Sequence, residues 1–219
     1  VKVFGASPVM AHAGEEVAEM AGIAGALVLN IGTLTTDFVE AMILAAKSAN
    51  KKGIPVVLDV CGAGATKFRD EKCFEILDTV SVSIIKGNSS EIARIAGESV
   101  STKGVDASAV EKNLQEIARD LAAKRNCTVV ITGKEDIVAD EKRVVRVRNG
   151  HEMMASIVGT GCMATSVIGT FAAVEKDLVS ACVAGLVCYE IAAELAAAKA
   201  EGPGSFKELL FDAVFNLDA

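Results

Sequence analysis

Short apolar runs alternate with helical patterns along this chain, and the alternation limits the possible folds more than any other feature. Four runs lack a polar face and are too short for helices: residues 26–30, 55–59, 83–86 and 128–132. Strands that are apolar on both faces are typical of parallel sheets with both sides covered by helices. The sequence therefore predicts an α/β fold with a mainly parallel central sheet and helices on both faces.

Helical patterns fill the segments between and after these runs. Residues 36–52 form an amphipathic pattern, with Thr35 or Thr36 as the N-cap and Gly53 just past the end. Further helices are expected at residues 89–96, 107–124, 161–174, 178–199 and 205–216. Two segments instead alternate apolar and polar side chains, which predicts an antiparallel hairpin at one edge of the sheet: residues 136–140 and 143–147.

The composition favours one domain and argues against nucleic acid as a partner. A chain of 219 residues without an interdomain linker suits a single core, so residues 1–219 are expected to form one domain. Aromatic residues make up 4% of the chain and Trp is absent, so Ala, Val, Ile and Leu must fill the core. The net charge is −7 and no basic run is present, so the chain offers no electrostatic footprint for nucleic acid.

Cysteine spacing and charge placement indicate a cytoplasmic protein without a membrane span. No pair of the six cysteines has the CxxC spacing, which argues against a zinc ribbon or a disulfide framework and for a reducing compartment. The most apolar stretch, residues 181–200, contains Glu190, Glu194 and Lys199. Those charges predict a buried or interface helix rather than a membrane span.

A glycine-rich turn, Gly159, Thr160, Gly161 and Cys162, stands before a helix of small residues. Glycines let a phosphate approach the backbone, and the first turn of a helix offers unpaired N–H groups and a favourable dipole. The same dipole stabilises a thiolate, so Cys162 is a candidate base for an attacking hydroxyl. The alternative is a plain glycine turn, with Cys162 packed as a small apolar residue.

Polar side chains also follow three of the predicted strands. Asp59 ends the second run, and glycines follow it; it is a candidate Mg²⁺ ligand or, alternatively, a cap for the loop. Lys86 ends the third run as a candidate phosphate ligand, and Glu91 lies one helical turn later as a second metal candidate. Thr132 ends the fourth run, where it is a weaker candidate for a nucleotide phosphate. Lys86 and Glu91 also have an alternative, as solvated surface residues.

The positions of these elements together indicate a reaction class. Ligands of open α/β sheets bind beyond the carboxyl ends of the strands, and all four elements fall there or at a helix start. Phosphoryl transfer depends on positioning and charge neutralisation, which such groups provide. A Rossmann dehydrogenase fits less well, because no G-x-G-x-x-G motif follows the first run.

These motifs, in this order, resemble the hydroxyethylthiazole kinase family of thiamine salvage, within the ribokinase-like superfamily. The resemblance covers essentially the whole chain and rests on residues 5–10, 26–34, 58–66, 86–91, 132–133, 159–162 and 202–206. It implies transfer of phosphate from ATP to the hydroxyl of 4-methyl-5-(2-hydroxyethyl)thiazole. It also implies a homotrimer with active sites between subunits.

The resemblance assigns roles residue by residue. Cys162 stands where most ribokinase-like enzymes carry an Asp as catalytic base, and a Cys is usual in this family. The remaining assignments are Met10 and Gly159 for the thiazole, Lys86, Thr132 and Gly161 for ATP, and Asp59 and Glu91 for Mg²⁺.

The sequence departs from the family pattern at three places. The family usually shows Asp-Pro-Val-Gly where this chain has Asp59, Val60, Cys61 and Gly62, so the loop after Asp59 lacks its proline. Many members carry Arg where Lys86 stands, which keeps the charge but loses the bidentate fork. The family begins with about 30 further residues, so the chain is expected to lack that segment.

Other functions on the same fold stay open from the residues alone. A hydroxymethylpyrimidine kinase and an ADP/ATP-dependent NAD(P)H-hydrate dehydratase are two alternatives, and both usually carry Asp where Cys162 stands. A non-catalytic protein that binds a thiazole or a nucleotide is a third. The presence of Asp59, Glu91 and Cys162 together argues against that third alternative.

Overall fold

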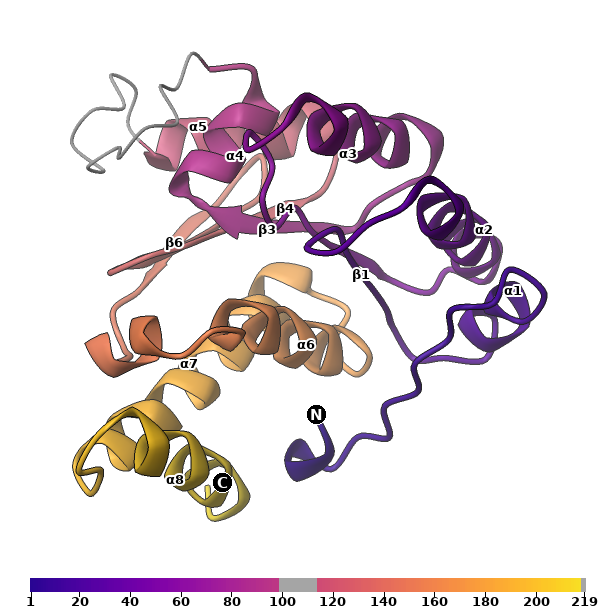
Figure 1. Cartoon of the computed structure of the whole chain (residues 1–219). Helices are drawn as coiled ribbons and strands as arrows, with labels where there is room; N and C mark the ends of the chain where they lie inside the picture. Colours follow the sequence, from indigo (N-terminus) through magenta and orange to yellow (C-terminus); the bar gives the residue numbers. More distant parts are fainter. Residues whose placement is uncertain (99–113, 218–219) are drawn as a thin grey trace.

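A six-stranded sheet lies between two layers of helices in the computed structural model, which describes residues 1–98 and 114–217 (Figure 1). The strands lie side by side in chain order; the first four are parallel, and the last two add antiparallel. They are β1 (Leu27–Asn30), β2 (Val56–Asp59), β3 (Ile84–Asn88), β4 (Thr128–Thr132), β5 (Asp136–Ala139) and β6 (Val144–Val147). The predicted α/β class, parallel sheet and edge hairpin are confirmed.

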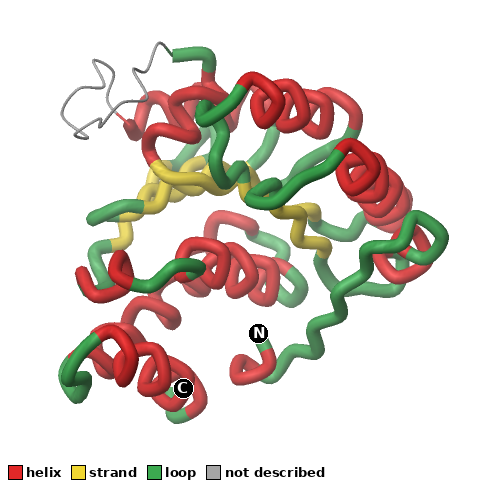
Figure 2. The backbone as a smooth tube through the Cα atoms, in the orientation of Figure 1, coloured by secondary structure: helices red, strands yellow, loops and turns green. Residues whose placement is uncertain are grey.

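Helices cover both faces of the sheet, and Figure 2 shows the strands enclosed between the two helical layers. One face is covered by α2 (Thr36–Lys52), α3 (Lys67–Thr79), α4 (Ser89–Ala96) and α5 (Leu114–Arg125). The other is covered by α6 (Thr160–Ala172), α7 (Leu178–Ala197) and α8 (Pro203–Phe215). Three shorter helices complete the described part: η1 (Lys2–Phe4), α1 (Val17–Ala21) and η3 (Glu152–Ser156). Each face of the sheet therefore has its own core, built mainly from aliphatic side chains.

Local signals account for the ends of several helices. Thr35, rather than Thr36, caps α2 by accepting a hydrogen bond from the backbone N–H of Phe38, and Gly53 ends that helix in the left-handed region at φ 68°. Asn88 and Glu91 form a capping box at the start of α4. The strands and helices that position the site therefore begin where side-chain chemistry favours them.

The predicted elements differ from the structure in a few places. β3 runs two residues beyond the predicted end, because Gly87 and Asn88 pair with Ile131 and Thr132 of β4. The sequence did not predict α3, whose charged residues give a weak helical pattern despite a Thr66 cap. The short helices α1, η1 and η3 were not predicted either. Of the predicted helix at 107–124, residues 107–113 lie outside the described residues, and α5 follows them.

α7 is a core helix. Within the described residues it alone is long and apolar enough to cross a membrane, but half of that apolar stretch is buried inside the protein. It packs against α6 and α8 and reaches β4, β5 and β6. Glu190, one of its charged residues, lies buried against the sheet. The prediction of a buried or interface helix agrees with this packing, and the helix covers residues 178–197.

Candidate active site

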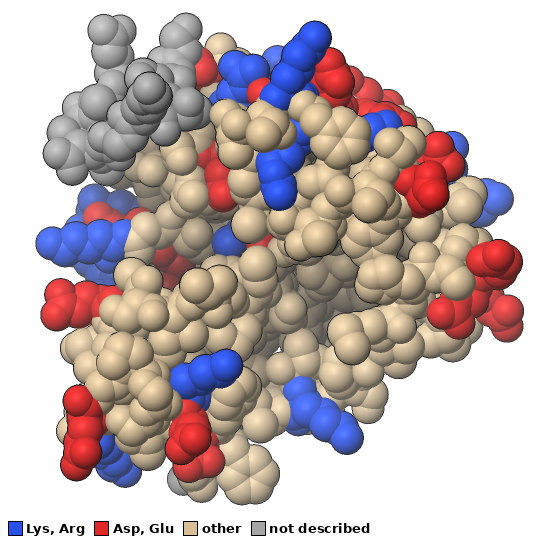
Figure 3. Space-filling model, viewed as in Figure 1, with Lys and Arg blue, Asp and Glu red and all other residues tan. Residues whose placement is uncertain are grey.

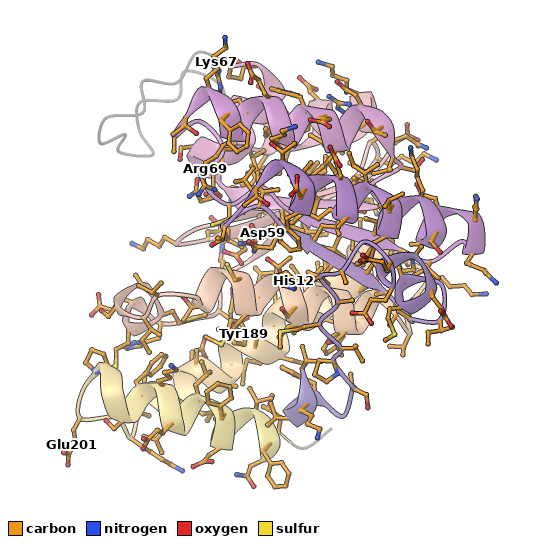
Figure 4. The ribbon with its side chains drawn as sticks, turned by 45° about the vertical axis from the view of Figure 1, so that its right-hand side comes forward. His12, Asp59, Lys67, Arg69, Tyr189 and Glu201 are labelled. Atoms are coloured by element: carbon orange, nitrogen blue, oxygen red, sulfur yellow. The ribbon has the colours of Figure 1, made fainter. Side chains whose placement is uncertain are left out.

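The register of the sheet brings the predicted site residues together at the carboxyl edge. Asn30 of β1 stands beside Asp59 of β2, and Asp59 stands beside Lys86 of β3. At the end of β3, Asn88 pairs with Thr132 of β4. The first turn of α6 packs under this edge, and Figure 4 shows Asp59 where the sheet meets that helix. The sequence had predicted that Asp59, Lys86, Thr132 and the start of α6 converge here, but not that Asn30 joins them.

Asp59 is the centre of the site. Its carboxylate is fully buried, and Oδ2 accepts hydrogen bonds from Thr165 Oγ1 at 2.6 Å and from Asn30 Nδ2 at 3.1 Å. Lys86 Nζ lies 3.5 Å from the same oxygen. The other oxygen, Oδ1, is buried without a hydrogen-bond partner among the described residues. A buried carboxylate is rarely left half satisfied, so Oδ1 is suited to a ligand that the protein does not itself supply.

Lys86 is buried and faces α6 rather than solvent. The residue is 4% exposed, and its Nζ lies 3.3 Å from where a Cβ on Gly161 would stand. The lack of a side chain at Gly161 therefore leaves space between the ammonium and the helix start. A cation beside an uncapped helix N-terminus forms a site for an anion such as phosphate.

Cys162 occupies the first turn of α6. Its Sγ accepts a hydrogen bond from Asn30 Nδ2 at 3.3 Å, so one amide links this thiol to Asp59. Gly159 precedes the helix in the left-handed region at φ 101°, and no side chain caps the helix end. The N–H groups of the first turn are thus left for a ligand. The sequence did not predict the role of Asn30, although its place at the end of β1 was a usable signal.

A second thiol lies against Cys162. Burial, first, and then the neighbouring Asp59, Cys162 and Glu91 side chains raise the pKa of Cys61 to about 11. Cys61 therefore stays protonated at neutral pH and is unsuited to act as a base. Of the two thiols at this edge, Cys162 is the one placed in the first turn of a helix and bonded to Asn30.

Glu91 ties two loops together at this edge. Its Oε1 accepts a hydrogen bond from the N–H of Gly62, and its Oε2 accepts one from the N–H of Asn88, both at 2.7 Å. Glu91 is therefore not the freely solvated surface residue that was the alternative from its sequence. Among the described residues, no three His, Cys, Asp or Glu side chains are grouped to hold a metal ion by themselves. A cation here must take most of its ligands from phosphate and water, as Mg²⁺ does beside nucleotides.

The remaining predicted residues lie around this centre at different depths. Thr132 is partly exposed at the end of β4, and the N–H of the next residue, Gly133, donates to Asp136 Oδ1 at 2.9 Å. Met10 lies in the extended segment before α1 and is 92% exposed, so the other site residues do not enclose it within this chain. The space-filling view shows the surface hollowed between α6 and the layer of α2 to α5 (Figure 3).

Sequence reasoning missed Arg69, which links the loops after β1 and β2 (labelled in Figure 4). Its guanidinium donates to the carbonyl oxygens of Ile31 at 2.6 Å, Gly32 at 2.8 Å and Cys61 at 3.2 Å. The planar guanidinium has several N–H donors in fixed directions and can bond to all three carbonyl oxygens at once, which a lysine ammonium cannot. Arg69 thereby fixes the backbone on which Asn30 and Asp59 stand.

Replacing Arg69 with Lys is expected to lower the free energy of unfolding by about 1–3 kcal/mol, because charge-assisted hydrogen bonds are lost. Urea unfolding measures this loss. Arg119, on the exposed side of α5, provides the matched control: Arg119→Lys is expected to change stability by less than about 0.5 kcal/mol. Equal stability of the Arg69→Lys variant and the control would show that the guanidinium fork is not needed.

Comparison with known proteins assigns the family. The model of the hydroxyethylthiazole kinase family matches residues 2–219. A curated relative from Methanosarcina acetivorans, named hydroxyethylthiazole kinase, is 55% identical over 216 residues, which cover 99% of this chain and 83% of the relative. A solved structure from Pyrococcus horikoshii OT3, described as a hydroxyethylthiazole kinase protein, is 41% identical with a TM-score of 0.90. The match covers 100% of this chain and 82% of that one.

A more distant structure supports the predicted fold. A ribokinase-like superfamily protein from Enterococcus faecalis V583 is 14% identical, with a TM-score of 0.66, and the match covers 92% of this chain and 67% of that one. At that identity the likeness concerns the fold alone, and it confirms the ribokinase-like architecture. The full-length family match and the close relatives go further: this chain belongs to the hydroxyethylthiazole kinase family.

Proposed function

We propose that the chain transfers the γ-phosphoryl group of ATP to the hydroxyl of 4-methyl-5-(2-hydroxyethyl)thiazole, as thiamine salvage requires. One observation carries this proposal. Cys162, in the open first turn of α6, shares the amide of Asn30 with the buried Asp59–Lys86 pair. A base for the hydroxyl, donors for phosphate and a carboxylate for a cation therefore meet within one network.

The base in this proposal is Cys162. Its thiolate takes the proton of the substrate hydroxyl while the oxygen bonds to the γ-phosphorus, and the bond from that phosphorus to the bridging oxygen of ADP breaks. Asn30 orients the sulfur through its amide hydrogen. The uncapped N–H groups at the start of α6 stabilise the charge on the transferred phosphoryl group.

ATP and the thiazole occupy opposite sides of this turn in the proposal. Lys86, Thr132 and the backbone at Gly161 hold the phosphates, which is supported by the approach of the Lys86 ammonium to Gly161. Gly159 and Met10 contact the thiazole. The support for Met10 is that an apolar side chain so exposed in one chain suits a pocket completed by a neighbouring subunit.

The residues present fit a magnesium ion. The unpartnered Oδ1 of Asp59 is the kind of ligand that Mg²⁺ takes from protein, with Glu91 as the second carboxylate of the site. When bound, Mg²⁺ neutralises charge on the phosphate oxygens. The hydrogen bond from Thr165 and the ion pair with Lys86 hold the Asp59 carboxylate itself in position.

We also infer a cytoplasmic homotrimer with active sites between subunits. Cysteines free of disulfides throughout the described residues suit a reducing compartment. Met10 and the neighbours of the two proposed thiazole-binding residues, Met10 and Gly159, expose apolar side chains that suit burial against another subunit. The exposed side chains are those of Val9, Met10 and Val158.

The test is release of ADP by the purified protein with Mg-ATP, with and without hydroxyethylthiazole. ADP formed only with the thiazole alcohol supports the proposal. Turnover of hydroxymethylpyrimidine or of hydrated NADH in its place would assign one of the other activities of this fold. Tight binding of ligands without any ADP would contradict catalysis altogether.

A further inference from the structure

Two buried carboxyl groups lie close to the nucleotide side of the site, and the proposed reaction uses neither. Asp136 begins β5 and is 4% exposed, and Glu190 lies on α7 and is 6% exposed. β5 and α7 pack against each other, and the two carboxyl groups face each other across that contact, where each acts on the pKa of the other. Oε2 of Glu190 is buried and accepts no hydrogen bond from a donor among the described residues. Two ionised carboxylates in contact away from water repel each other, so one shared proton satisfies both groups.

The electrostatic surroundings agree with a shared proton. Burial, first, and then contact with Asp136 raise the pKa of Glu190 to about 9, and the charge of Glu194 on the same helix adds to this. Burial also raises the pKa of Asp136, while the hydrogen bond to Glu190, the N–H of Gly133 and the charge of Lys86 act in the opposite direction. Glu190 therefore carries the proton at neutral pH, while Oδ1 of Asp136 accepts from the N–H of Gly133.

Other charged groups packed near the pair are engaged elsewhere. The loop before η3 lies against Glu190, since a Cβ on Gly150 would stand 3.6 Å from Glu190 Cγ. In this loop, Arg148 pairs with Glu135, and the ring of His151 accepts from the N–H of Met153. In the part of the chain that the structure describes, Lys86 is thus the cation that acts on the pair, and it also faces Asp59.

The pair connects α7 to the wall of the site formed by β4. Asp136 Oδ1 accepts from the N–H of Gly133, the residue directly after Thr132. Next to Glu190, the hydroxyl of Tyr189 donates to the carbonyl oxygen of Thr160, the first residue of α6, at 3.3 Å. Two successive residues of α7 therefore hold the two backbone segments between which the phosphates are proposed to bind.

We propose that Glu190 and Asp136 share one proton and act as positioning residues that fix the Gly133 turn, and with it Thr132, for the phosphates of ATP. This inference rests on the proposed function for the role of Thr132. Loss of the proton leaves two adjacent negative charges, which separate and release the turn. The added charge also offsets the positive charge that Lys86 offers to phosphate.

The test compares Mg-ATP affinity in the wild type and in Glu190→Gln. Calorimetric titration from about pH 7 to about pH 10 is expected to show about a tenfold loss of affinity in the wild type. The glutamine amide donates to Asp136 at every pH, so Glu190→Gln is expected to match the wild type at about pH 7 and to change less than about twofold. Any other group that titrates over this range is present in both proteins.

Glu194→Gln is the matched control, because Glu194 lies one turn further along α7 and accepts from the N–H of Gly150 instead. It is expected to keep the alkaline loss of affinity, with the midpoint at slightly lower pH because the charge of Glu194 no longer helps to raise the pKa of Glu190. An infrared band of a protonated carboxyl group, present in the wild type at neutral pH and absent in Glu190→Gln, reports the proton without any ligand. That result separates failure of this inference from failure of the kinase proposal.

Two outcomes would overturn the inference: parallel pH profiles in the wild type and Glu190→Gln, or no protonated carboxyl band in the wild type. Asp136→Asn covers the case in which Glu190→Gln does not fold. Its carbonyl oxygen still accepts from Gly133 and its amide donates to Glu190, which then ionises at lower pH. In that variant the infrared band is expected to disappear at a lower pH than in the wild type, and the loss of ATP affinity is expected to move to lower pH with it.

Discussion

Replacing Asp59 with Asn is expected to lower kcat by at least about 10³-fold, with the protein still folded. Asn keeps an oxygen that accepts from Thr165, but it removes the charge that faces Lys86 and the free oxygen suited to Mg²⁺. Breaking a buried ion pair costs about 3–5 kcal/mol of stability, which many domains tolerate. ADP release across a series of Mg²⁺ concentrations measures the effect, with urea unfolding alongside.

Asp70 provides the control for this variant. It is also a buried aspartate, and it pairs with Arg94 at 2.7 Å and accepts from the N–H of Gly64, away from Lys86 and Cys162. Asp70→Asn is expected to lose less stability than Asp59→Asn, because Arg94 is half exposed, and to change kcat by less than about tenfold. If Asp59→Asn retained kcat to the same degree as the control, Asp59 would have no part in the chemistry.

The sequence predicted the centre of the site because strand order and chain order coincide in this fold. Each parallel strand ends at the same edge, so Asp59, Lys86 and Thr132 were expected to converge from their places in the chain alone. The start of α6 was equally visible, since a glycine turn before small residues marks an open helix end. The fold and the main candidates therefore followed from local pattern.

The side chains that bond to these residues could not be predicted from the sequence, because they lie far from them along the chain. Thr165 bonds to Asp59 across 106 positions, and Arg69 reaches the carbonyl of Ile31 across 38. Thr and Arg occur in many helices without such tasks, so neither carries a local signal. The Glu190 and Asp136 pair was hidden for the same reason, and on a helix as apolar as α7 the charge was interpreted only as evidence against a membrane span.

Cys162→Ala is expected to lower kcat by about 10²–10⁴-fold, the range that a general base contributes. The affinity for ATP is expected to stay within about threefold, because Lys86 and the helix N–H groups remain. Single-turnover measurement of ADP formation separates the chemical step from binding. A loss of ATP affinity equal to the loss in kcat/KM would instead make Cys162 a binding residue.

Cys162→Asp distinguishes a base from a packing residue. A carboxylate is ionised at neutral pH without help, and Asn30 donates to an oxygen as readily as to sulfur, so this variant is expected to retain activity within about tenfold. Cys61→Val is the matched control beside it, because the Cys61 thiol stays protonated and has no part in proton transfer; kcat is expected to change by less than about threefold. An inactive Cys162→Asp enzyme that still binds ATP would contradict the role of Cys162 as base, since a correctly held carboxylate at that position has what the proton transfer requires.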